Sequence, residues 1–96
     1  MKLPTKLRVL GHDILVKRVN VGLSMTRNIG EYDADHAVIT VKMGLETSVE
    51  DATILHEVIH AIDNTLNLDM SEEQVTGVAQ GIFQFLADNS FYTRKK

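Results

Sequence analysis

The chain of 96 residues contains no cysteine, no long apolar run and no strong excess of charge of either sign. Without cysteine, disulfide bonds and zinc sites built on thiolate ligands are excluded. No segment approaches the roughly 18 consecutive apolar residues of a membrane-spanning helix. Residues 1–8 also lack the apolar run of a secretory signal. We therefore expect a soluble cytoplasmic protein that has no membrane partner.

Charge also argues against a nucleic-acid partner. The formal net charge is −3 at pH 7, and acidic and basic residues are interspersed. The only basic cluster, Arg94-Lys95-Lys96, is expected to be a solvated tail. The length and a hydrophobic content of 44% fit one small domain spanning residues 1–96, with no repeat or linker. The oligomeric state stays open.

The first forty residues carry a strand pattern. Apolar residues that alternate on both sides of residues 11–13 predict a β-hairpin. Residues 22–30 are typical of a loop or an irregular edge. A second hairpin is expected from residues 31–32, a polar turn at 33–36 and a strand over 37–42. We expect an antiparallel sheet of three to four strands.

The second half of the chain is helical. Ser48 and Asp51 resemble a capping box, and a helix is expected from there to about Leu66. Its predicted buried stripe is Ala52, Ile54, Leu55, Val58, Ile59, Ile62 and Leu66. Ser71 and Gln74 form a second capping box that starts another helix. The predicted fold is therefore α+β, with the sheet packed on two helices.

The second predicted helix has an apolar face and two glycines. Its expected core residues are Val75, Val78, Ala79, Ile82, Phe85 and Leu86. Gly77 and Gly81 each weaken a helix by about 1 kcal/mol relative to alanine. They indicate either close approach to the backbone of the preceding helix or tolerated weakness, and the sequence leaves both readings open.

The segment His56-Glu57-Val58-Ile59-His60 is the main functional signal. Two histidines four residues apart lie on one face of a helix, close enough to bind one metal ion. Glu57 is rotated roughly 100° from His56, so it lies beside such an ion and can take a proton from a metal-bound water. This is the arrangement of a zinc hydrolase. The alternative is two ordinary helical histidines at the edge of the core.

A catalytic zinc usually has three protein ligands, so a third is needed. Glu72 is favoured because it projects near the apolar face of the second helix, whereas Glu73 points away and is the second choice. His12 and His36 fall in predicted turns and are weaker candidates. Asp63 is too far along the helix to share the ion with His56. It either accepts the far N–H of His60 or simply faces solvent.

Taken together, these features resemble a minimal zincin of the gluzincin type. The resemblance is more specific to small phage-encoded metallopeptidase-like proteins related to the ImmA/IrrE type. It covers roughly residues 30–89. The segments that carry it are Gly30-Glu31-Tyr32-Asp33, Ile39-Thr40-Val41, Leu55 through Asp63 and Ser71-Glu72-Glu73-Gln74-Val75.

The resemblance implies a zinc metallopeptidase of narrow specificity whose partner is a peptide or protein substrate. His56 and His60 would bind Zn²⁺, and a glutamate of the following helix would complete the site. Glu57 would be the general base toward the zinc-bound water and then the proton donor to the leaving amine. A substrate peptide would pair with the strand at 37–42. Tyr32 and Tyr92 are candidates for contacting the oxyanion.

Two other functions stay open at this level. A non-catalytic zinc-binding phage accessory protein would keep the scaffold and act through protein–protein contact. A purely structural metal site would have all its coordination positions filled by protein ligands.

Overall fold

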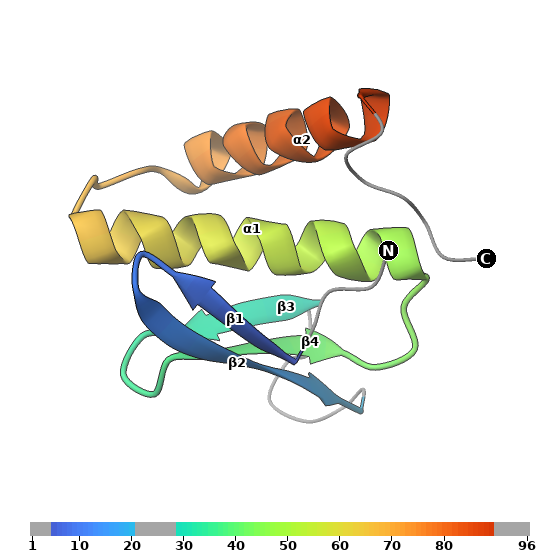
Figure 1. Ribbon diagram of the computed structural model, residues 1–96, viewed down its shortest axis with the longest axis horizontal. Helices are drawn as coiled ribbons and strands as arrows, with labels where there is room; N and C mark the ends of the chain where they lie inside the picture. The colour runs from blue at the N-terminus through green and yellow to red at the C-terminus, as the bar shows by residue number, and fades with distance from the viewer. Residues whose placement is uncertain (1–4, 21–28, 90–96) are drawn as a thin grey trace.

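The computed structural model describes residues 5–20 and 29–89, which form three layers with a long helix in the middle (Figure 1). The described strands are β1 (Lys6–Val9), β2 (His12–Val19), β3 (Gly30–Asp33) and β4 (Val38–Lys42). The helices are α1 (Thr47–Leu66) and α2 (Glu72–Asp88). The predicted α+β class is confirmed. Neither helix in this part of the chain is long and apolar enough to cross a membrane.

The sheet is mixed, with the strand order β1-β2-β4-β3. Both predicted hairpins are confirmed, because β1 pairs antiparallel with β2 and β3 pairs antiparallel with β4. The prediction of a wholly antiparallel sheet is wrong, since β2 and β4 run parallel. β2 is the second strand of the first hairpin and β4 is the second strand of the other. These two strands lie side by side and run in the same direction. A turn fixes only its own hairpin and leaves the pairing between hairpins undetermined.

The strand order also changes which strand can receive a peptide. β4 has β2 on one side and β3 on the other, so both of its edges are paired. The expectation that a substrate pairs with residues 37–42 is therefore wrong. In the described part of the sheet, β1 and β3 are the edge strands, and only an edge strand offers unpaired backbone groups.

The start of α1 differs from the predicted capping box. The helix begins at Thr47, and its N-cap residue Glu46 makes no side-chain cap hydrogen bond. Ser48 already lies in the first turn, where its hydroxyl donates to the Glu46 carboxylate at 3.2 Å. Asp51 is buried. The end at Leu66 is confirmed, and Asn67 follows it in the left-handed conformation with φ 55°.

The middle helix has two buried faces. Ile54 and Ala61 pack against the sheet, whereas Ile59 packs against Val75 and Ala79 of α2. Ile54 and Ile59 point roughly 140° apart around the helix. Three members of the predicted stripe, Ile54, Val58 and Ile62, therefore pack against the sheet, and Ile59 faces α2. Ala61, which also packs against the sheet, was not expected. Leu66 at the end of that stripe is 53% exposed, which contradicts its predicted burial.

The second helix is buried only in part. The capping box of Ser71 and Gln74 is confirmed, with both reciprocal hydrogen bonds present. The predicted apolar face is wrong in its outer part, since Val78, Ile82 and Phe85 are exposed. A Cβ atom added at Gly77 or Gly81 would meet nothing within 4 Å. The expected close backbone approach is therefore absent, and the two glycines are tolerated.

Candidate metal centre beside α1

The two histidines of the motif lie on the face of α1 between the sheet and α2. His56 and His60 have their ring centroids 5.0 Å apart. Their side chains are 24% and 30% exposed, so both rings are partly removed from water. This is the shared helix face that the four-residue spacing predicts.

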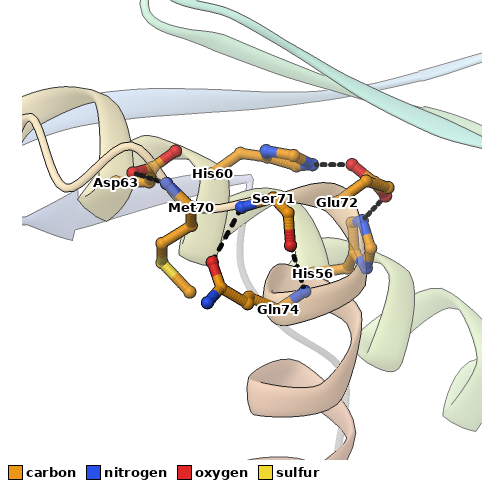
Figure 2. Close-up of polar contacts among 7 residues, drawn as sticks. All are labelled: His56, His60, Asp63, Met70, Ser71, Glu72 and Gln74. Carbon is orange, nitrogen blue, oxygen red and sulfur yellow. Dashed lines mark hydrogen bonds and ion pairs between the residues drawn. The ribbon is translucent and has the colours of Figure 1, made fainter.

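Glu72 reaches both histidines from the first turn of α2. Its Oε2 lies 2.8 Å from Nε2 of His56, and its Oε1 lies 3.0 Å from Nε2 of His60. Figure 2 shows the carboxylate between the two rings. Glu73, the other glutamate considered, is exposed, and no contact with either ring is found for it in the described residues. The structure thus brings together the three residues predicted as ligands.

The loop between the helices explains how Glu72 is placed. The Asp63 carboxylate accepts the backbone N–H of Met70 at 3.0 Å (Figure 2). The Asp63 carbonyl accepts the backbone N–H of Leu68 at 3.1 Å. Asp63 is therefore a support of the loop that precedes Ser71. It makes no hydrogen bond with His60 within the described part of the chain, so the first of the two roles considered for Asp63 is not found.

Glu57 is buried against the sheet. It is 7% exposed, and no hydrogen bond or ion pair to its carboxylate is found among residues 5–20 and 29–89. Burial raises the pKa of Glu57. The nearby rings of His60 and His56 oppose that rise, and the carboxylates of Glu72 and Glu31 add to it. Glu57 is thus held close to the histidines and stays free to exchange a proton.

Gly30 allows this burial and was missed by sequence reasoning. A Cβ atom at Gly30 would lie 2.6 Å from Cγ2 of Thr53 and 3.6 Å from Oε2 of Glu57. The first residue of β3 therefore approaches α1 more closely than any side chain would permit. No local signal marks Gly30, because the contact joins residues that are far apart in the chain.

A metal fits the donor atoms of this group. The ligand atoms of His56, Glu57 and His60 all lie within 4.8 Å of one another. Glu72 is the better carboxylate ligand, because its two oxygens already lie at hydrogen-bond distance from both Nε2 atoms. Two imidazoles and one carboxylate are a common ligand set of catalytic zinc, whose ligand atoms lie about 3.3 Å apart. The contacts to Glu72 need to lengthen by only a few tenths of an ångström.

The weaker candidates lie elsewhere. Nδ1 of His36 is 2.8 Å from the Asp33 carboxylate in the turn between β3 and β4. His12 begins β2, and neither histidine lines the groove described below. Tyr32 does line that groove and packs partly against the core, whereas Tyr92 lies outside the described residues.

The candidate metal centre, made of His56, Glu57, His60 and Glu72, opens into a groove of about 1730 Å³. Its floor is α1, one wall is α2 from Glu72 to Gln84 and the other is β3, the edge strand. The groove is long enough to be lined by residues from Ser48 to Asn64 of α1. It therefore gives an extended ligand access to the histidines.

Comparison of the chain with protein-family models, with curated proteins and with solved structures finds no match. The functional argument consequently rests on the geometry of His56, Glu57, His60 and Glu72.

Proposed function

We propose that this protein is a zinc-dependent metallopeptidase of narrow specificity. His56, His60 and Glu72 would hold Zn²⁺, and Glu57 would be the catalytic base. The observation that carries the proposal is that Glu72, from a separate helix, contacts Nε2 of both histidines. Beside them lies the buried carboxylate of Glu57, for which no partner is found among the described residues. We also propose that the protein is related to small phage-encoded zincins and that it is located in the cytoplasm.

Each residue of the proposed site would have a separate role in peptide hydrolysis. A bound Zn²⁺ would polarise the scissile carbonyl and lower the pKa of water toward about 7. Glu57 would accept the proton of the attacking water and then donate it to the leaving amine. Its free lone pairs and its raised pKa both suit that task. His56, His60 and Glu72 would keep the reacting atoms beside it.

The edge strand β3 is the best place for the substrate backbone. The carbonyl of Ile29 accepts the N–H of Lys42 at 2.8 Å, so Ile29 and Lys42 form a hydrogen-bonded pair. Backbone groups alternate in direction along an antiparallel strand. The N–H and C=O groups of Gly30 and Tyr32 should therefore point to the free edge, where an extended peptide could pair with them.

Metal analysis of protein purified without added metal tests the ligands. We expect about one zinc per chain in the wild type and in Glu73→Gln, the matched control. We expect His56→Ala and Glu72→Gln to lose it. A protein that is metal-free in its native state, or one that keeps zinc in both of these variants, would overturn the ligand assignment.

Peptide cleavage tests the base. Glu57→Gln should keep its zinc and lose at least about 100-fold in the rate of cleavage of a degenerate peptide library. An unchanged rate would contradict the role of Glu57.

One observation favours the second function, a non-catalytic protein that acts by protein–protein contact. Val78, Ile82 and Phe85 of α2 are exposed, and clustered apolar side chains often mark contact surfaces. In that case Glu57→Gln would preserve biological function, and polar substitution of Ile82 would abolish it.

A further inference from the structure

The groove beside α1 is strongly acidic. Glu31, Glu57, Asp63 and Glu72 are among the residues that line it, and no lysine or arginine of the described residues does so. These four carboxylates carry a formal charge of −4. A divalent ion would reduce that to −2 with both histidines neutral. The groove thus has a negative charge that the described protein does not neutralise.

Glu57 is the most deeply buried of these four residues. Its side chain lines the groove, is 7% exposed and has no hydrogen-bond or ion-pair partner in the described ranges. A buried carboxylate without a hydrogen-bond partner is unfavourable, and a donor group brought by a ligand would satisfy it. The groove therefore favours an occupant that carries positive charge.

The position of Glu31 on β3 would let it contact a peptide bound along that strand. It is in the middle of β3 opposite Thr40, next to Gly30 and Tyr32. Its backbone groups point to β4, because Ile29 two residues earlier makes its hydrogen bond in that direction. In a peptide that pairs antiparallel with β3, the residue facing Glu31 would occupy a non-hydrogen-bonded position. Side chains approach most closely at such positions.

We propose that the groove selects a basic peptide segment and that Glu31 determines this specificity by pairing with a lysine or arginine of the substrate. This inference deepens the proposed function and rests on it. Glu31 holds neither the metal nor the reacting atoms. It is exposed, and no partner for its carboxylate is found among the described residues, so it is available to a ligand.

Two degenerate peptide libraries of equal length test the proposal. One has lysine or arginine at alternate positions and the other has aspartate or glutamate there, with all remaining positions the same. Binding is measured by fluorescence anisotropy on full-length, zinc-loaded Glu57→Gln protein, which should leave the peptides intact. We expect about tenfold tighter binding of the basic library at about 50 mM salt, with the difference shrinking at about 500 mM.

Charge reversal at Glu31 is the decisive variant. In the Glu57→Gln background, Glu31→Lys should weaken binding of the basic library about fivefold and strengthen binding of the acidic one. Glu73→Lys is the matched control, because it makes the same change in net charge on a residue that does not line the groove. It should alter binding less than twofold. In the active protein, Glu31→Lys should raise KM for basic peptides and leave kcat nearly unchanged.

The possible outcomes separate this inference from the proposed function. A protein that holds zinc and cleaves both libraries equally well overturns the charge selection and leaves the metallopeptidase standing. Equal effects of Glu31→Lys and Glu73→Lys overturn the role of Glu31. A protein that binds no zinc but still prefers basic peptides overturns the metallopeptidase and supports the charge selection.

Discussion

Replacing Glu57 with glutamine should stabilise the metal-free protein although it should abolish cleavage. Glu57 is 7% exposed and has no hydrogen-bond partner in the described part of the chain. Its raised pKa, caused first by burial, means that the folded state disfavours the charged carboxylate. Glutamine has nearly the same shape and no charge, so it removes this unfavourable term.

The magnitude follows from the cost of burying a carboxylate that has no partner. A buried polar group without a hydrogen bond costs about 1–3 kcal/mol, and the glutamine amide keeps part of that cost. We expect Glu57→Gln to raise the free energy of unfolding by roughly 1 kcal/mol at pH 7. For a domain of this size that is about 4–8 °C in Tm.

The pH dependence has a definite sign. The pKa of Glu57 is higher in the folded than in the unfolded chain, so the folded state binds more protons between those two values. The stability linked to this proton is present below the unfolded pKa and is lost as pH rises through the folded pKa. The advantage of Glu57→Gln should therefore be present at pH 7 and disappear in acid.

Glu50 provides a matched control on the same helix. It is 6% exposed, like Glu57, but Nε of Arg18 donates to its carboxylate at 2.9 Å. Glu50→Gln should lower the free energy of unfolding by about 2 kcal/mol, because it weakens a buried ion pair. Urea denaturation of both variants in the presence of a chelator, at pH 7 and near pH 4, measures the two effects. A Glu57→Gln variant that is no more stable than the wild type at pH 7 would refute the reasoning.

Three further predictions concern the packing and the metal. Gly30→Ala should destabilise the protein by about 2 kcal/mol, because the added methyl group meets Thr53 Cγ2 at 2.6 Å, whereas Gly77→Ala should stabilise it by about 0.5–1 kcal/mol in the same urea assay. Zinc at 100 times its Kd should stabilise the wild type by about 2.7 kcal/mol and Glu72→Gln by much less, as measured by thermal unfolding. Asp63→Ala should cost about 1 kcal/mol, because it removes the acceptor of the Met70 N–H; an unchanged Tm would contradict its role in the loop.

Local signals were sufficient for much of the fold. The two hairpins, the end of α1 at Leu66 and the capping box at Ser71 each depend on residues close in the chain, and all were predicted correctly. The shared face of His56 and His60 is local in the same sense, since helix geometry alone determines it.

Contacts between distant segments were not predictable in this way. The parallel pairing of β2 with β4 depends on how two hairpins meet, and both hairpins have apolar residues that fit either direction. The approach of Gly30 to Thr53 also depends on this assembly. The apolar residues of α1 spread over most of its circumference, so their pattern did not reveal that one face meets the sheet and another meets α2.

The burial of Glu57 follows from the motif once these three layers are known. His56 and His60 face the gap between the sheet and α2, because only there can Glu72 reach both rings. Glu57 lies roughly 100° from His56 around the helix, so it cannot share the gap and must turn toward one of the two neighbouring layers. It turns toward the sheet, where Gly30 leaves space for it. This position puts the Glu57 carboxylate beside the proposed metal site and also removes it from water. The stability that Glu57→Gln should restore is therefore a direct consequence of the position that the proposed catalysis requires.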